Sequence, residues 1–491
     1  MAVDGSMYGG AIMKGRVSHS PLRTSLLFTG LTFVQPAVNF LLLPLYLAYL
    51  TPSEYGLYAL MVTVSVLAHH LAALRVQDAM GPLYFRFGRQ PGEQRVFLDG
   101  LLQATLVLNV LFLMVALGVG PWIFASLFSD GGAPDFFPYG VLAVLIGVLN
   151  SISGPYLGFV KNGRQVRRFA ALHLGLVAAN VGAQLSLIVV LQRGALGALE
   201  ARLAGPALLA LVALAVSARG GGGRRRRPDW EHLRAAFRFS LPLLPFAAVV
   251  WVAAFADRVW IERSFDLTTL GTYSLLLALV TMVTMASHAS WNGIQPFLFE
   301  ELSALGGPST RRLQQLARTY FSIPFLVGGA LAAGAPLLHA LTDEPGYLAV
   351  LTYATAGIAV YLTESVGIFL RGLLTHALKP AIISIATTIS VAIQFGSYII
   401  LIPHFGINGA LAGILAGQLI LIAILLISLR TKAPQALPSL KILAPPLILI
   451  PLFLLPKLIG DFGWIASPWT GILQFSCIFL PILGYFLKKE D

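Results

Sequence analysis

The chain has 491 residues, of which 57% are hydrophobic and only 11% are charged. Soluble domains contain about 25% charged residues, so this composition excludes a soluble enzyme of the same length. A single cysteine, Cys477, excludes an internal disulfide framework. The formal net charge of +12 could indicate a nucleic-acid-binding protein, but in so apolar a chain it is more typical of basic loops beside a membrane, and we expect no nucleic-acid partner.

About fourteen apolar stretches follow one another, each close to the roughly 20 residues that cross a bilayer as a helix. They cover residues 25–50, 55–74, 96–124, 137–160, 169–191, 197–216, 239–261, 271–291, 320–341, 347–370, 381–402, 407–429, 442–459 and 468–487. The first stretch is too long for the apolar part of a signal peptide, so we expect it to stay in the mature protein. The sequence predicts an all-α polytopic membrane protein.

Basic residues alternate between the loops. The loops after even-numbered stretches and the two ends of the chain hold most of the 33 lysines and arginines. Because these residues resist translocation, we expect both termini and all even-numbered loops in the cytoplasm. Four basic residues fall on the opposite side: Arg193, Arg202, Arg263 and Lys457.

The longest basic loop contains four glycines followed by four arginines, at 220–227. No aromatic side chain lies among these arginines, as a site that stacks bases would require. We interpret the loop as a flexible cytoplasmic hinge that also fixes the topology, with attraction to anionic lipid head groups as a secondary effect.

Two motif pairs indicate an internal repeat. Gly56 and Tyr58, after the first stretch, match Gly271 and Tyr273, after the seventh. The sequence Gly-x-x-Gly-Ala-Leu that begins at Gly194, after the fifth stretch, matches the one at Gly406, after the eleventh, with nearly the same spacing. Because six spans separate the partners, the two halves should face the same way and pack about an axis along the membrane normal, with a cavity between them.

The repeat predicts the domain organisation. In chain order we expect a cytoplasmic tail (1–24), a six-helix lobe (25–217), a basic cytoplasmic linker (218–238), a second six-helix lobe (239–430), and two additional helices with a cytoplasmic tail (431–491).

Prolines interrupt the first and seventh stretches at corresponding places. They are Pro36, Pro44, Pro242 and Pro245. Broken helices at matched positions of two repeats are a good indication of a transport path.

Five short segments in three regions of the chain carry a resemblance to a known family. Residues 50–59 (LTPSEYGLYA) are similar to the first-loop signature of the polysaccharide-transporter, or O-antigen flippase, family. Residues 239–245 (FSLPLLP), with Ala256-Asp-Arg258 and 270–274 (LGTYS), resemble its seventh span and following loop, and 405–411 (FGINGAL) resembles its turn before the twelfth. The family belongs to a superfamily that also contains multidrug exporters and lipid II flippases.

The resemblance implies a flippase in a bacterial inner membrane. Its substrate would be an undecaprenyl-pyrophosphate-linked oligosaccharide, carried to the outer leaflet by alternating access for O-antigen, capsule or exopolysaccharide synthesis. Membrane lipids, and the polysaccharide polymerase and chain-length machinery, are the other partners it suggests. We expect no cofactor and no metal site.

Charged groups inside spans are functional candidates, because each costs roughly 2.5–3.5 kcal/mol to place at the bilayer centre. Arg75 and Arg258 are candidates for binding the pyrophosphate, although Arg75 could pair with Asp78 and Arg258 with Glu262. The candidates for ion coupling are His69, His70, Asp78, Asp257 and Glu364. Histidine pairs of this kind also form interhelical hydrogen bonds, so both alternatives stay open.

Neutral polar residues in the spans could bind sugar hydroxyls. Asn39, Gln184 and Asn292 are the candidates, together with Asn180 and Gln394. Hydrogen bonds between helices explain such residues equally well.

Two other function classes compete. A membrane enzyme acting on lipid-linked sugars would need acid and base groups on a sizeable loop, and the sequence has no such loop, so we expect no enzyme. A lipid II flippase or a cation-coupled small-molecule exporter of the same superfamily remains the alternative. The exporter would need a cavity lined with carboxylates, whereas the spans offer Asp78, Asp257 and Glu364.

Overall fold

The computed structural model of the protein describes residues 30–31, 34–35, 37–80, 83–84, 91–128, 135–220, 230–241, 243–302, 310–376, 380–432 and 450. Within these ranges every regular element is a helix. Nine of the helices there are long and apolar enough to cross a membrane, which confirms the all-α membrane class. The expected spans at 442–459 and 468–487, Cys477, Pro36, Pro242 and the arginine run of the linker lie outside the described residues.

The first lobe consists of the helices that precede the linker. They are α2 (Leu43–Tyr49), α3 (Pro52–Ala72), α5 (Pro91–Leu127), α6 (Val141–Asn162), α7 (Val166–Gln184) and α8 (Gly194–Gly220), with short turns η1 (Val76–Ala79), η2 (Phe136–Gly140) and η3 (Leu185–Val190). A capping box starts α3, because the Thr51 hydroxyl accepts from the backbone N–H of Glu54 and the Glu54 carboxylate accepts from that of Thr51.

The second lobe follows the linker. It contains α10 (Leu243–Ser264), α11 (Leu267–Leu302), α12 (Thr310–Gly334), η4 (Ala335–Leu337), α13 (Leu338–Leu341), α14 (Pro345–Leu348), α15 (Val350–His376) and α16 (Pro380–Lys432). The 53 residues of α16 are about twice the length of one span. Gly406, with φ of +55°, bends this helix between the expected stretches 381–402 and 407–429.

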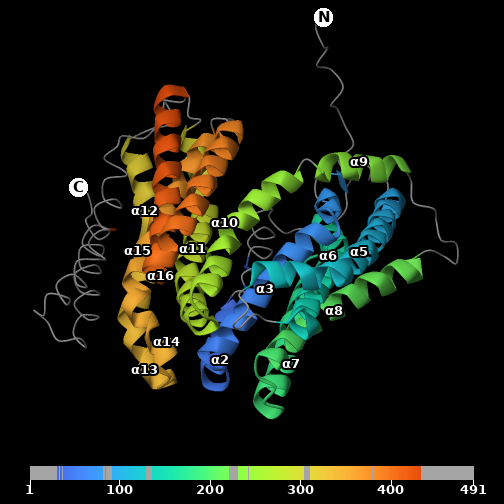
Figure 1. Ribbon diagram of the computed structural model, residues 1–491. Coiled ribbons are helices and arrows are strands. Elements are labelled where there is room, and N and C mark those ends of the chain that lie inside the picture. Colours follow the sequence, from blue (N-terminus) through green and yellow to red (C-terminus); the bar gives the residue numbers. More distant parts are fainter. Residues whose placement is uncertain are drawn as a thin grey trace, which may run out of the picture.

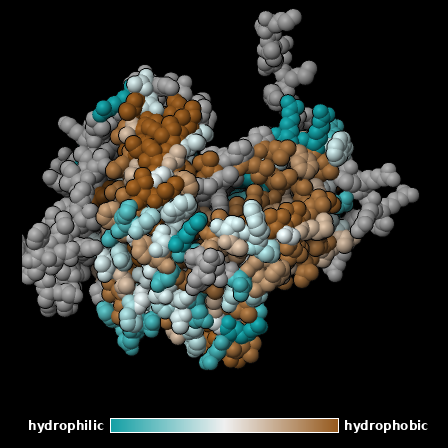
Figure 2. All heavy atoms as spheres, in the orientation of Figure 1, coloured by the Kyte–Doolittle hydropathy of each residue, from teal (hydrophilic) through white to brown (hydrophobic). Residues whose placement is uncertain are grey.

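Figure 1 shows the two lobes side by side, with α5–α8 on one side and α11–α16 on the other. The principal contact between them joins α3 to α11. Hydrophobic residues cover much of both lobes (Figure 2). Rows of exposed apolar side chains run along α5 at Val107, Val110 and Met114 and along α16 at Ile385 and Ile389, as expected of helices that face acyl chains.

The glycines of the second motif pair adopt the same backbone conformation. Gly194 and Gly406 have φ of +56° and +55°, and among the described glycines they alone have positive φ. Only glycine adopts this conformation without steric cost, which explains its presence at both sites. A side chain at Gly194 would overlap the Glu54 carboxylate, and one at Gly406 would lie 3.4 Å from the Phe265 ring. Each turn therefore packs against the matched loop of its own lobe.

Part of the expected flexible linker is helical. Helix α9 (Trp230–Ser240) lies at the end of the molecule drawn at the top of Figure 1. It buries Leu233 and Ala236 and packs against α5, where His232 meets the Phe97 ring edge to face at 5.6 Å. Arg95, Arg168 and Arg238 lie at this same end, which we call the basic end. The opposite end, where α2 leads into α3, has fewer basic residues, and for that reason we call it the charge-poor end.

Candidate functional site between the two lobes

Gly56 of α3 and Gly271 of α11, which the repeat matches, touch each other across the lobes. A Cβ at Gly56 would overlap the carbonyl oxygen of Leu267 and lie 2.8 Å from the Gly271 nitrogen. A Cβ at Gly271 would lie 2.7 Å from the carbonyl carbon of Pro52. Pro52 and Leu267 are themselves matched by the repeat, so the contact is two-fold symmetric, as in an isologous interface.

Further hydrogen bonds surround this contact. The Tyr347 hydroxyl, in α14, donates to the carbonyl oxygen of Leu50 at 2.9 Å. The Tyr347 ring meets the Tyr55 ring edge to face, with centroids 6.2 Å apart. We call Leu50, Pro52, Gly56, Gly271 and Tyr347 the clamp. It joins the two lobes at their charge-poor end.

A polar cluster in the first lobe adjoins the clamp. The Tyr46 and Tyr58 hydroxyls share a hydrogen bond of 3.1 Å, and Tyr46 also donates to the side-chain oxygen of Gln184. Arg202 Nη1, from α8, donates to the Tyr58 hydroxyl at 3.1 Å. Tyr46, Tyr58 and Gln184 are buried, so these bonds replace water for each polar group.

The position of Arg202 differs from the expected one, which was with the loops on the side opposite the cytoplasm. It lies within α8, half-buried, with its guanidinium directed to Tyr58 of α3. Its position inside the apolar stretch 197–216 was the signal that could have marked it. A cation held inside a span by a buried partner is a functional candidate of the same rank as Arg258.

The matching cluster in the second lobe contains a carboxylate. Asp257 of α10 is 4% exposed and accepts from the Tyr273 hydroxyl at 2.5 Å and from the backbone N–H of Arg258 at 2.7 Å. Arg258 Nη1 lies 3.8 Å from an Asp257 oxygen. Glu262, the alternative partner for Arg258, is 1% exposed.

The two clusters lie on helices that pack together, α3 and α10. The Tyr55 ring of α3 packs against the Tyr46 and Tyr58 rings of the first cluster, with centroids 5.9 and 6.3 Å apart. Arginines beside tyrosine hydroxyls suit the oxygens of a phosphate and the hydroxyls of a sugar, because guanidinium is a rigid multiple donor for such groups. This arrangement is the candidate head-group site.

Arg75 and Asp78 pair with each other. Arg75 Nη2 lies 2.6 Å from Asp78 Oδ2, and the two side chains are 23% and 35% exposed. Helix α3 ends at Ala72, and Arg75 adopts a left-handed φ of +58° ahead of η1. The ion pair that the sequence offered as the alternative to pyrophosphate binding therefore forms, beyond the end of α3.

The remaining ion-coupling candidates lie in two places. His69 and His70 are neighbours at the end of α3, with ring centroids 5.1 Å apart, and His69 packs beside Gly147 of α6. Glu364 of α15 accepts from the Thr284 hydroxyl of α11 at 2.8 Å. Neither group joins the cluster around Asp257 by a hydrogen bond.

The neutral polar candidates divide by exposure. Asn39 and Asn292 are exposed. Asn180 accepts from the backbone N–H of Gly205 in α8, and Gln394 donates to the Tyr398 hydroxyl in its own helix. Asn180 and the buried Gln184 thus hold helices together, and a role of Asn39 and Asn292 in binding sugar hydroxyls stays a prediction.

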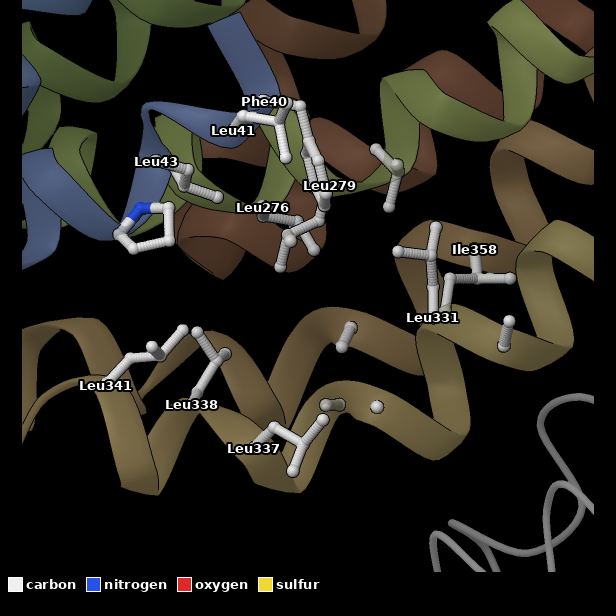
Figure 3. A pocket seen from close by; sticks show the side chains of 16 residues that line it. Phe40, Leu41, Leu43, Leu276, Leu279, Leu331, Leu337, Leu338, Leu341 and Ile358 are labelled. Carbon is white, nitrogen blue, oxygen red and sulfur yellow. The ribbon is translucent and has the colours of Figure 1, made fainter. Parts of the chain in front are cut away.

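An apolar pocket of about 300 Å³ lies between the lobes (Figure 3). The first lobe contributes Phe40, Leu41, Leu43 and Pro44, and the second contributes side chains of α11, α12, η4, α13 and α15, among them Leu276, Leu331, Leu338 and Ile358. Every side chain that lines the pocket is nonpolar. It offers room for hydrocarbon and no hydrogen-bond partner from a side chain.

Pro44 lies beside this pocket at an irregular place in the first span. The helical turn ahead of α2 runs to Leu41, Leu42 is a turn residue, and Pro44 occupies the first turn of α2. In the second lobe, α9 ends at Ser240 and α10 begins at Leu243.

No protein-family model matches the sequence, and no curated protein matches it. Solved structures do resemble it. A lipid II flippase MurJ in an inward closed conformation shares 14% identity and a TM-score of 0.60, over 94% of this chain and 98% of that one. An inward-facing multidrug resistance MATE transporter of the MOP superfamily shares 13% identity and a TM-score of 0.55, over 84% and 98%. The chain has the fold of these transporters.

Proposed function

We propose that this protein is a flippase of a bacterial inner membrane. Its substrate would be an oligosaccharide linked through pyrophosphate to a polyprenyl lipid, undecaprenyl. The observation that carries the proposal is the pairing of two unlike sites between the lobes. One is formed by the two polar clusters that hold Arg202 and Arg258, and the other is the apolar pocket beside α2. A substrate with an anionic, hydroxyl-rich head and a hydrocarbon tail needs both kinds of surface, whereas a small cation needs neither two arginines nor a separate apolar pocket.

In the proposed mechanism the two lobes rock about the clamp. With the clamp formed, the charge-poor end is closed and a head group would enter from the basic end, which we place in the cytoplasm together with both termini. Arg202 and Arg258 would hold the pyrophosphate by charge-assisted hydrogen bonds. Separation of Gly56 from Gly271 would then open the charge-poor end, while the tail stays in lipid and moves past α2.

Ion coupling is assigned to Asp257 in this proposal. Of the titratable candidates, Asp257 alone is nearly fully buried and bonded to both a tyrosine and an adjacent arginine at the lobe interface. A proton or a sodium ion on its carboxylate would weaken the hold on Arg258 and free that guanidinium for the substrate. His69, His70, Asp78 and Glu364 would then serve packing.

The first experiment is complementation of a bacterial strain that lacks its O-antigen flippase. Surface polysaccharide and the lipid-linked repeat unit remaining in the cytoplasmic leaflet are both measured, in cells where insertion of the protein is verified. Restored polymer with depleted precursor supports the proposal. Rescue of a strain depleted of its lipid II flippase, without rescue of polysaccharide export, would point to lipid II instead. Failure of both, together with cation-driven efflux of dyes from vesicles, would point to a small-molecule exporter.

A further inference from the structure

A second cavity, of about 460 Å³, lies within the first lobe at its basic end. It is lined by Arg95, Tyr156, Arg168, Ala171, Leu172 and Val216, which come from α5, α6, α7 and α8. None of these residues belongs to the site between the lobes. The cavity is therefore separate from the candidate head-group site.

The lining residues sit at the depth of lipid head groups. Arg95 lies four residues after the start of α5, Arg168 two residues after the start of α7, and Val216 four residues before the end of α8. Each is thus about one helical turn from the end of a span, where the head-group region of a bilayer begins.

The two guanidinium groups are held in place but retain free donors. Arg95 Nη2 donates to the carbonyl oxygen of Val216 at 3.0 Å, and Arg168 Nη1 donates to Gln165 Oε1 at 2.9 Å. A guanidinium has five N–H donors, so each arginine can still bind an anion. Two acids lie near Arg95 along α5: Glu93 is exposed to solvent, and Asp99 accepts from the Ser217 hydroxyl at 2.7 Å.

Exposed leucines lie farther along the same two helices, toward the middle of the spans. Leu174 of α7 is 51% exposed, and Leu211 of α8 is 66% exposed. The two helices pack against each other there, since a Cβ at Gly175 would lie at van der Waals distance, 3.7 Å, from Leu208. Arginines near the ends of helices that carry exposed leucines deeper in the spans match a molecule with an anionic head and acyl chains.

We infer that this cavity binds an anionic phospholipid of the leaflet at the basic end, with the phosphate between Arg95 and Arg168 and the acyl chains along α7 and α8. Basic pockets between helices on the cytoplasmic side of membrane proteins bind anionic head groups in this way. A free phosphate ester would leave the exposed leucines uncovered, and the like charge of the pocket would repel the arginine run of the linker. The inference does not depend on the transported substrate.

The test uses the full chain, purified in detergent and stripped of lipid. Palmitoyl-oleoyl phosphatidylglycerol or phosphatidylcholine is added, and native mass spectrometry and thermal unfolding report binding. We expect one tightly bound phosphatidylglycerol and a raised unfolding midpoint, with no such effect of phosphatidylcholine. The double variant Arg95→Gln/Arg168→Gln should bind phosphatidylglycerol about thirty-fold more weakly, because each basic residue near an anionic head group contributes about 1 kcal/mol and about 1.4 kcal/mol is a factor of ten.

Arg167→Gln/Arg430→Gln is the matched control. It removes the same amount of charge from exposed positions at the basic end that do not line the cavity. Arg168→Gln alone, which keeps the bond from Arg95 to Val216, serves if the double variant does not fold. The inference is overturned if the cavity variants keep the preference for phosphatidylglycerol, if the control variant loses it equally, or if soluble glycerol 3-phosphate raises the midpoint as much as the lipid.

Discussion

Tyr58 in the first lobe and Tyr273 in the second occupy matched positions two residues after the glycines of the clamp, yet they bind opposite charges. Tyr58 accepts a hydrogen bond from Arg202, whereas Tyr273 donates one to Asp257. The repeat matches Arg202 to Ile414 and Asp257 to Leu42. Neither charged residue therefore has a charged counterpart in the other lobe.

The difference teaches that the repeat conserves backbone geometry while the chemistry of each lobe is separate. Gly56 and Gly271 make reciprocal contacts, and Gly194 and Gly406 share a positive φ, because these positions determine how helices pack. Buried charges do not affect that packing in the same way. In the proposed function the first lobe contributes a cation for the head group, and the second contributes a carboxylate for the coupling ion.

The largest effect is expected from breaking the symmetric contact itself. Gly56→Ala or Gly271→Ala places a methyl group against backbone atoms of the other lobe, which cannot rotate away. Overpacking of this kind costs about 3 kcal/mol, so the ratio of closed to open molecules would fall about a hundred-fold. Leu50 is 4% exposed and lies against Tyr347. In a Cys477→Ser background, a Leu50→Cys variant should therefore react faster with an impermeant thiol reagent when the charge-poor end opens.

Gly293→Ala is the control for the clamp variants. It lies in the same helix as Gly271, and nothing lies within 4 Å of a Cβ placed there. Labelling of the Leu50 cysteine should stay at the parental rate in this variant. Equal labelling in the Gly271→Ala and Gly293→Ala proteins would show that the clamp does not close the charge-poor end.

The second prediction concerns Arg202 and Arg258, the arginines of the two polar clusters. Arg202→Gln and Arg258→Gln should each raise the substrate concentration for half-maximal flipping by roughly ten- to a hundred-fold, because a hydrogen bond to a charged group contributes about 1.5–3 kcal/mol. Insertion of the protein should be unchanged. Flipping of a fluorescent lipid-linked oligosaccharide in vesicles measures this effect. Arg263→Gln, an exposed position in α10, is the control, and a loss as large there would remove the assignment.

Asp257→Asn tests the other half of the comparison. The amide keeps the shape of the side chain and an oxygen for Tyr273, but it cannot bind a proton or attract a sodium ion. Transport driven by an imposed ion gradient should fall about ten-fold, to the rate seen without the gradient, which corresponds to a loss of about 1.4 kcal/mol of coupling. The flux in vesicles with and without a gradient measures this. A variant still stimulated by the gradient would return Glu364 and His69 to consideration.

The sequence was sufficient for the architecture and for part of the site. The apolar lengths and the two glycine pairs predicted helices, a bend at Gly406 and the matched loops, because packing geometry leaves a periodic record in the sequence. That Gly56 and Gly271 touch could not be predicted, since no local pattern reports how two distant helices approach. Arg202 was missed because a residue near the end of an apolar stretch reads as a loop residue, and its partner Tyr58 is far away in the chain.

The smallest effect is expected at Arg75. Its ion pair with Asp78 is partly exposed, and such pairs contribute about 0.2–1 kcal/mol. Its left-handed φ of +58° costs about 1–2 kcal/mol for a residue with a side chain. Arg75→Ala should therefore lower the unfolding midpoint, while Arg75→Gly loses the same ion pair but relieves the backbone and should unfold at a higher temperature than Arg75→Ala. If Arg75→Gly also transports at the parental rate, Arg75 ends a helix and binds no head group; a loss of transport comparable to that of Arg258→Gln would instead extend the head-group site to the end of α3.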